Sequence, residues 1–307
     1  MPQPLSTTPI ISVIVATRNR RESLRQFLEA LRVLSDPPAW ELIVANNGST
    51  DGTQSLFARL AADLPAVIVN EETPGKSRAL NRALNCARGD ILLFTDDDVV
   101  PGADWLAALH KASSEYPEAN VFGGRILVKS DSIPKWIMNS SNLKTILLSE
   151  QDFGNKICWF AADQYPAGPN LAVRRELLAR MSCSWPVNLG PGTGIPLGDE
   201  RAFLMQLSAS DSRDRLYVPS SVVHHIVRGR RLNITHALVR CFLGGYAAGL
   251  IGRMGEPSSV RLKEGPLRLA WRRFCKLSSS RELICVLARA LGVMAGSANP
   301  FIRVIYG

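Results

Sequence analysis

The chain has 307 residues, of which 46% are hydrophobic and 21% charged, a composition typical of a globular protein with one large core or two adjoining ones. The sequence predicts no membrane span, because no run of about 18 apolar residues is free of charge, and its first residues lack the form of a signal peptide. The net charge is +9, and residues 228–307 carry 14 Lys and Arg against three acids, which leaves a net −2 for the preceding residues.

The first 116 residues alternate between the patterns of strands and helices. Continuous apolar runs, typical of strands buried in a parallel sheet, lead into polar turns within 10–20, 40–53, 66–72 and 90–98. Apolar residues at helical spacing follow each run, within 21–34, 53–64, 75–89 and 102–116. This alternation predicts an α/β fold with a doubly wound, mostly parallel sheet flanked by helices.

Polar residues stand at the carboxyl ends of all four predicted strands: Thr17–Asn19, Asn46–Asp51, Glu71–Lys76 and Asp96–Asp98. In an open parallel sheet, ligands bind beyond these ends, so segments far apart in sequence should meet there. Three adjacent carboxylates repel one another unless a divalent cation neutralises them, and Mg²⁺ and Mn²⁺ prefer oxygen ligands. The alternative is an acidic turn in which Asp98 or Asp104 caps the next helix, but a cap needs one carboxylate and not three.

Six segments carry a resemblance to a known family, and they follow one another as "VIVATRNR", "IVANNGSTDGT", "GKSRALNRAL" with "GDILLFTDDD", "YPAGPNLAVRRELL", "IPLGDERAFLMQL" and "SSVVHHIVRGRRLNITHALVRCFLGGYAAG". In this order they resemble the motifs of the family 2 glycosyltransferases, which have the GT-A fold. The resemblance covers roughly residues 10–250. It implies transfer of a sugar, with inversion, from a UDP- or GDP-sugar to a glycan or lipid-diphosphate-linked acceptor.

The resemblance also implies a divalent metal, Mn²⁺ or Mg²⁺, which stabilises the leaving diphosphate. Asp96 and Asp98 match the two acids of the family's D-x-D motif, in which the first lies by the ribose and the second reaches the metal. Asp97 stands between them and is expected to point to a different face. His224 and His225 match the family's metal-site histidine, and either could be the ligand; the alternative is a strand with one buried and one exposed histidine.

For the nucleotide, the resemblance implies contacts from two turns, whose matching residues are Thr17, Asn19, Asn46 and Asp51. The family usually has Asp at the position of Asn46, where it meets an imino N–H of the base. An Asn side chain offers donors as well as an acceptor, so the identity of the nucleotide stays open. Lys76 and Arg78 could touch the diphosphate, or they could form a solvated helix face.

The reaction needs a carboxylate that takes the proton of the acceptor hydroxyl, and Asp199 and Glu200 match the family's acidic pair. The family order is usually Glu-Asp with the second acid as the base. Here the order is Asp-Glu, so Glu200 stands in the place of the base. Asp199 could instead be the N-cap of the helix that begins there.

The expected division is a nucleotide-sugar-binding half at 1–128, an acceptor-binding and catalytic half at 129–227, and a basic helical region at 228–307. Six cysteines without a C-x-x-C pair predict reduced thiols of a cytosolic protein. Residues 261–276 mix Arg and Lys with large apolar side chains, and 281–296 are apolar nearly all round. These segments predict reversible attachment to an anionic membrane surface, on the inner face of the cytoplasmic membrane.

Three other functions compete with sugar transfer. A nucleotidyltransferase acting on a sugar phosphate would normally carry a glycine-rich phosphate loop after its first strand, and "VATRNRRES" contains no glycine. An inactive nucleotide-sugar-binding module would not be expected to keep both acidic clusters. A nucleic-acid binder would use the basic region, but no aromatic-rich RNA-binding signature or zinc pattern accompanies that charge, so no nucleic acid partner is predicted.

Overall fold

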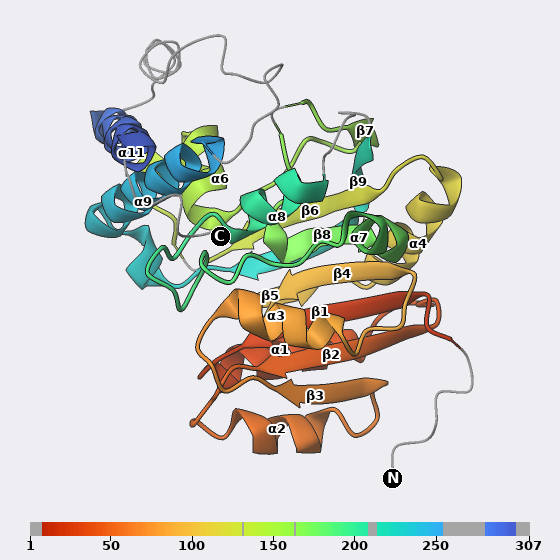
Figure 1. Ribbon diagram of the computed structural model, residues 1–307. Helices are drawn as coiled ribbons and strands as arrows, with labels where there is room; N and C mark the ends of the chain where they lie inside the picture. Colours follow the sequence, from red (N-terminus) through yellow and green to blue (C-terminus); the bar gives the residue numbers. More distant parts are fainter. Residues whose placement is uncertain (1–7, 131, 163, 208–213, 254–279, 299–307) are drawn as a thin grey trace. The chain divides into compact units, whose positions relative to one another are not determined.

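The computed structural model describes residues 8–130, 132–162, 164–207, 214–253 and 280–298 (Figure 1). The chain forms two compact units. The first comprises Met1–Lys129, Gln151–Val187 and Asp199–Ile226, and the second comprises Ser130–Glu150, Asn188–Gly198 and Val227–Gly307. The expected division at residues 128 and 227 concerns the roles of segments, and it stays a prediction.

The first unit contains one mixed, mostly parallel sheet. Its strands are β1 (Ile11–Thr17), β2 (Trp40–Asn46), β3 (Ala66–Asn70), β4 (Ile91–Asp96), β5 (Val99–Pro101), β6 (Val121–Lys129), β7 (Cys158–Trp159), β8 (Leu171–Arg174) and β9 (Arg215–Ile226). The order is β3-β2-β1-β4-β8-β6-β9-β5, with β7 also paired to β9. The first four strands run parallel, as predicted, whereas β8 is antiparallel to both its neighbours.

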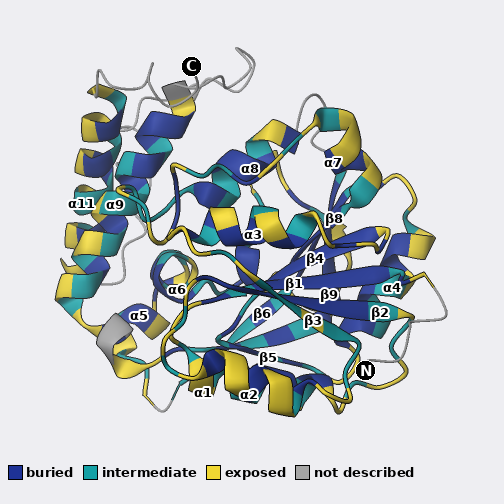
Figure 2. Ribbon diagram, turned by 60° about the horizontal axis from the view of Figure 1, so that its bottom comes forward, coloured by how far each residue is buried: buried dark blue, intermediate teal, exposed yellow. Residues whose placement is uncertain are grey.

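Helices cover both faces of this sheet (Figure 1). They are α1 (Arg21–Leu31), α2 (Thr53–Leu60), α3 (Lys76–Leu84), α4 (Trp105–Glu115), α7 (Arg175–Met181) and α8 (Asp199–Leu207). Side chains alternate across a strand, so β1 contributes Val13 and Val15 to a core with α1, α2 and α4. It contributes Ile14 to a second core with α3, α7 and α8. Figure 2 shows the sheet as the buried layer between these helices, which confirms the predicted doubly wound α/β architecture.

The register of the sheet brings the predicted polar ends together. Thr17 pairs with Asn46, and Ala16 pairs with Asp96, so the last residues of β1, β2 and β4 lie side by side. After two further residues the chain enters the short strand β5, which pairs with β9 such that Val99 lies opposite His225. This strand was not predicted from the sequence, and its pairing determines which residue of β9 lies next to the acidic triplet.

The second unit contains α5 (Lys135–Met138), α6 (Ser141–Leu148), α9 (Ile234–Arg253) and α11 (Ser280–Ala298). The helices α9 and α11 run parallel and touch through glycines. A Cβ on Gly245 would overlap the carbonyl oxygen of Arg289, and a Cβ on Gly292 would overlap that of Phe242. Such close backbone approach requires small residues in both helices. The predicted segment at 261–276 lies outside the described residues.

By length and composition, α9 could cross a membrane, since Ile234–Gly252 has a mean hydropathy of 1.4. The sequence predicted no span, because no run of about 18 apolar residues in the chain is free of charge. In the structure, 39% of this stretch is buried. A core helix of a soluble protein can have the same length and composition.

The glycine contact predicts that Gly245→Ala destabilises the second unit although alanine favours helices. The added methyl would meet backbone atoms of α11, which cannot rotate away, and such overpacking costs about 1–3 kcal/mol. Gly252→Ala is the matched control, because no atom lies within 4 Å of its added Cβ and it lies in the same helix. The free energy of unfolding should fall for Gly245→Ala alone in urea titrations followed by circular dichroism. Equal values for the two variants would contradict the packing.

Candidate active site

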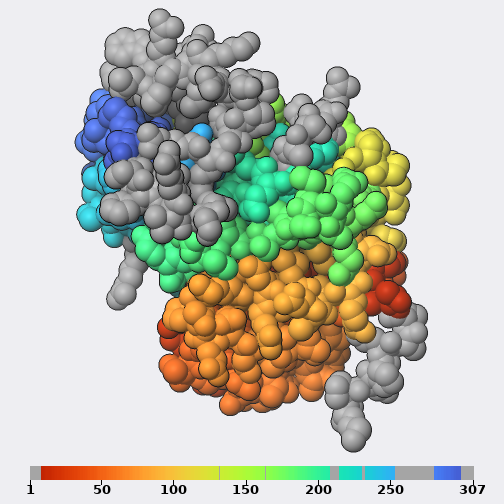
Figure 3. Space-filling model, in the orientation of Figure 1, coloured from red at the N-terminus to blue at the C-terminus, as the bar shows by residue number. Residues whose placement is uncertain are grey.

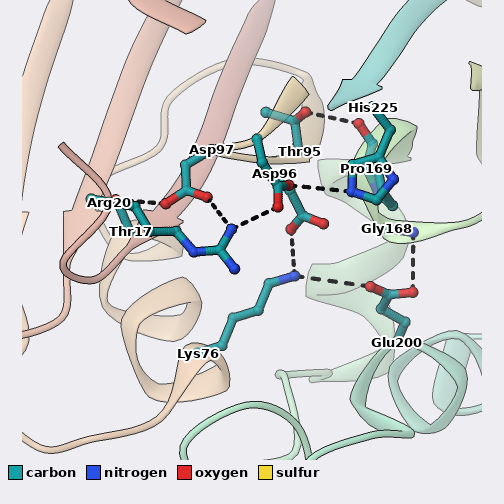
Figure 4. A network of polar contacts seen from close by, with 11 residues as sticks. Thr17, Arg20, Lys76, Thr95, Asp96, Asp97, Gly168, Pro169, Glu200 and His225 are labelled. Atoms are coloured by element: carbon teal, nitrogen blue, oxygen red, sulfur yellow. Dashed lines mark hydrogen bonds and ion pairs between the residues drawn. The ribbon is translucent and has the colours of Figure 1, made fainter. Parts of the chain in front are cut away.

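The candidate site is built where β4 ends, with residues from five other segments around it (Figure 4). Asp96 is the last residue of β4, and the next two aspartates form the turn into β5. Around them lie the end of β1, the turn before α1, the first residue of α3, the strand β9 and the helix α8. All of these belong to the first compact unit.

Asp97 links the end of β1 and the turn after it to the end of β4. Its side chain is almost fully buried; its Oδ2 accepts a hydrogen bond from the Thr17 hydroxyl at 2.7 Å, and its Oδ1 accepts one from Nη1 of Arg20 at 2.8 Å. Burial raises the pKa of Asp97 to about 6, Arg20 opposes this increase, and the neighbouring Asp98 adds to it. Thr17, expected at the nucleotide, is therefore bound to a carboxylate for which no role was predicted.

Asp98 lies between Arg20 and His225. Its Oδ2 accepts a hydrogen bond from Nη1 of Arg20 at 2.7 Å, and its Oδ1 lies 3.5 Å from Nε2 of His225. The pairing of β5 with β9 produces this approach, because the N–H of Ile226 donates to the carbonyl of Asp98 at 2.8 Å. His224 alternates to the opposite face of β9, so the structure brings His225 and not His224 to the acidic triplet.

A divalent cation would find two suitable protein ligands here. The carboxylate of Asp98 and the imidazole of His225 form a pair of O and N donors that suits Mn²⁺, with phosphate and water to complete the shell. Among the residues that the structure describes, no group of three or more His, Cys, Asp and Glu side chains could hold a metal on its own. The donors thus fit a metal that is bound jointly with a phosphorylated ligand.

Lys76, the first residue of α3, connects the acidic triplet to the candidate base. Its Nζ lies 2.6 Å from Oδ1 of Asp96 and 3.9 Å from Oε1 of Glu200, and its side chain is 18% exposed. Burial disfavours the charge of Lys76, but the carboxylates of Asp96, Glu200 and Asp199 prevail and raise the pKa of Lys76 above its ordinary value. Lys76 was expected at a diphosphate, and in the structure it is paired with carboxylates instead. Arg78 is exposed on the same helix.

Glu200 lies near the start of α8, and its Oε2 accepts a hydrogen bond from the N–H of Gly168 at 3.1 Å. A Cβ on Gly168 would overlap this carboxylate, so a larger residue there would displace the side chain of Glu200. Partial burial raises the pKa of Glu200 to about 7; Lys76 opposes this increase, and Asp199 and Asp96 add to it. A carboxylate with such a pKa is well matched to a proton transfer near neutral pH.

Asp199 is the first residue of α8 and is buried. Its Oδ2 has no hydrogen-bond partner in the described part of the chain. Burial raises the pKa of Asp199, and Lys76 opposes that increase. Glu200 is the more accessible acid of the pair, because its side chain is 34% exposed.

The two turns expected at the nucleotide are tied to each other. The N–H of Asn19 donates to Oγ of Ser49 at 3.0 Å, and the N–H of Thr50 donates to Oδ1 of Asn19 at 2.8 Å. Asn19 adopts a left-handed backbone conformation, with φ at 51°, which asparagine tolerates better than most residues. Asp51 accepts from the N–H of Arg21 at 2.9 Å, so three hydrogen bonds fix the distance between the turns.

Asn46 is buried at the end of β2, and both ends of its amide are used. Its Nδ2 donates to Oδ1 of Asn70 at 3.0 Å, and its Oδ1 accepts from the N–H of Ser49 at 3.1 Å. These bonds orient the amide at the position where the family usually has a carboxylate.

Comparison with known proteins agrees with this architecture. The model of the family described as glycosyl transferase family 2 matches residues 12–181, which is more than half of the chain. The chain is 39% identical to the uncharacterized glycosyltransferase YfnE of Bacillus subtilis over 114 residues, covering 37% of this chain and 29% of that protein. It is 33% identical to glycosyltransferase AglE of Haloferax volcanii over 104 residues, covering 33% and 34%. The matches thus span about a third of these relatives.

Solved structures share the fold over most of the chain. One is the mannosyltransferase PcManGT of Pyrobaculum calidifontis in complex with GDP-Man and Mn²⁺, with a TM-score of 0.59, 21% identity and coverage of 98% of this chain and 79% of that one. Another is S. aureus TarS 1–349 in complex with UDP-GlcNAc, with a TM-score of 0.53, 16% identity and coverage of 94% and 89%. With the family match, these likenesses show that the chain belongs to glycosyltransferase family 2 and has the GT-A fold.

Proposed function

We propose that the protein transfers a hexose from a UDP- or GDP-sugar to a hydroxyl group of a glycan or lipid-diphosphate-linked acceptor. The observation that carries the proposal is the position of Lys76 between two carboxylates with different tasks. Asp96 lies 2.6 Å from its Nζ on the donor side, and Glu200 lies 3.9 Å from it on the acceptor side. A donor diphosphate and an acceptor hydroxyl would therefore meet within one small polar site. The mannosyltransferase with GDP-Man and TarS with UDP-GlcNAc support a nucleotide-sugar donor.

Glu200 is the proposed general base. As the acceptor oxygen forms its bond to the anomeric carbon, the bond from that carbon to the diphosphate breaks and the acceptor proton passes to Glu200. One in-line displacement of this kind inverts the anomeric configuration and needs no covalent intermediate. The hydrogen bond from Gly168 fixes one carboxylate oxygen, which leaves Oε1 for the incoming proton.

On the donor side, Asp98 and His225 would hold Mn²⁺ or Mg²⁺, while Asp96 would face the ribose. When bound, the metal would stabilise the negative charge that develops on the leaving diphosphate. Thr17, Asn19, Asn46 and Asp51 would shape the nucleotide site through the hydrogen-bonded turns described above. The mannosyltransferase of similar fold is in complex with GDP-Man and Mn²⁺, which supports a divalent metal beside the nucleotide-sugar.

We also propose that the protein is cytoplasmic and attaches to the inner face of the cytoplasmic membrane through its C-terminal region. Four large apolar side chains of α11 stand at helical spacing and are 39–56% exposed: Ile284, Leu287, Leu291 and Met294. Figure 3 shows atoms of α11, coloured blue, at the molecular surface. An apolar helix face combined with the basic charge of residues 228–307 suits an anionic lipid surface, near a lipid-linked acceptor.

The first prediction from this function concerns Glu200→Gln, which keeps the shape and removes the base. Turnover should fall by about 10²-fold or more while donor affinity changes little. In the wild type, kcat/KM should rise with pH up to about 7 and then level off, because only the deprotonated carboxylate accepts the proton. Steady-state rates and donor titrations measure both effects.

The matched variant is Asp199→Asn. If it abolishes turnover and Glu200→Gln does not, the two acids have exchanged roles. If neither variant loses activity, the base lies elsewhere. An inactive binding module would bind the donor and show no turnover even in the wild type.

The second prediction is that Mn²⁺ strengthens binding of GDP or UDP through Asp98. Calorimetric titrations with Mn²⁺ and then with EDTA should show weaker binding without the metal, because the ion links the carboxylate to the phosphates. In Asp98→Asn, the nucleotide affinity should be the same with Mn²⁺ and with EDTA. In Asp104→Asn, which changes an exposed aspartate close by, Mn²⁺ should still strengthen the binding. Equal affinity of the wild type in both conditions would remove the metal assignment.

The third prediction is that the full-length protein pellets with vesicles containing phosphatidylglycerol and much less with phosphatidylcholine vesicles or at high salt. Leu287→Gln combined with Leu291→Gln should reduce binding several-fold, because it removes apolar surface from α11. Val33→Gln combined with Val67→Gln is the control, since it changes exposed valines of the other unit. A wild-type protein that ignores anionic vesicles would show that the apolar face has another role.

A further inference from the structure

Two side-chain cations compensate the acidic triplet in the present structure (Figure 4). Lys76 pairs with Asp96, and Arg20 pairs with both Asp97 and Asp98. The carboxylates were predicted site residues, whereas Arg20 was not. Its position decides which charges a metal ion would meet on entering the site.

The two bonds of Arg20 differ in their surroundings. The same Nη1 atom lies 2.8 Å from Oδ1 of Asp97 and 2.7 Å from Oδ2 of Asp98. Asp97 is 4% exposed and is also fixed by the hydroxyl of Thr17, so it cannot turn toward water. Asp98 is 11% exposed and faces His225 as well. The guanidinium is thus anchored at Asp97, while its second bond goes to a carboxylate that has another possible use.

A divalent cation held by Asp98 and His225 would share one carboxylate with this guanidinium. Like charges that close repel strongly, because the site is only partly solvated. Arg20 is itself 40% exposed, so its side chain can adjust while one bond to Asp97 remains. An incoming anionic diphosphate would offer the released N–H of Nη1 a new acceptor, since guanidinium binds phosphate well.

We propose that Arg20 is the resident counter-cation of the metal site and that a divalent metal binds by displacing it from Asp98. The inference rests on the proposed function, which assigns Asp98 and His225 to the metal. It follows that the free protein binds metal weakly and that a nucleotide diphosphate strengthens the binding. Arg20 then acts as a positioning residue that couples metal binding to the presence of the donor.

The test is Mn²⁺ affinity without nucleotide, measured from the electron paramagnetic resonance signal of free Mn²⁺. Arg20→Gln should bind Mn²⁺ about tenfold more tightly than the wild type or more, which corresponds to about 1.4 kcal/mol. Arg20→Lys keeps the competing charge and should stay close to the wild type. Arg18→Gln is the matched control, because it removes an equal charge from an exposed neighbour.

Removing Arg20 alone leaves Asp97 buried without this partner, which could impair folding. The gain in Mn²⁺ affinity is therefore also measured between Asp97→Asn and the double variant Arg20→Gln/Asp97→Asn. In this pair, the loss of Arg20 leaves no charged Asp97 without its partner. Combining Arg20→Gln with Asp98→Asn should cancel the gain, because the competition takes place at Asp98.

No gain, or a loss of affinity, in both comparisons would overturn the role of Arg20; a loss would mean that Arg20 orients Asp98 for the metal. If Asp98→Asn binds Mn²⁺ as well as the wild type, the metal assignment of the proposed function fails, and the inference fails with it. If Asp98→Asn lowers the Mn²⁺ affinity and Arg20→Gln does not raise it, only the role of Arg20 is wrong.

Discussion

The mutual repulsion of three adjacent carboxylates at the end of β4 is the constraint on which the site depends. Asp97 can be buried only because Thr17 and Arg20 reach it from the end of β1 and the turn after that strand. The parallel pairing of β1 with β4 supplies that approach, because Ala16 lies beside Asp96 in the register. The sheet that buries the apolar strands therefore also supplies the charges that make the acidic turn tolerable.

The fold was largely predictable because its signals are local. Each of the first four strands is a continuous apolar run, and each following helix has its own apolar spacing, so neither needs distant information. The pairing of β5 with β9 was not predictable, since it joins three residues to a strand more than a hundred residues later. That pairing distinguishes His225 from His224. The sequence predicts that their side chains point to opposite faces of the strand, but it does not predict which of the two faces Asp98.

The candidate site was predicted by residue type but not by partner. Arg18, Arg20 and Arg21 look alike in the sequence, and only the packed turn places Arg20 against two carboxylates. Lys76 likewise reads as one more basic residue of a helix. Its pairing with Asp96 and Glu200 depends on where α8 lies over the sheet, which no local pattern of α3 contains.

The same lysine makes the two sides of the site electrostatically dependent on each other. Lys76 opposes the rise that burial causes in the pKa of Glu200, and it also forms an ion pair with Asp96. Solvent screens the charge of Lys76 only in part, because the lysine side chain is 18% exposed. A group that binds at Asp96 must therefore share or release the lysine, and Glu200, 3.9 Å away, experiences the change directly. A charged group that binds at Asp96 would consequently change how readily Glu200 takes up a proton.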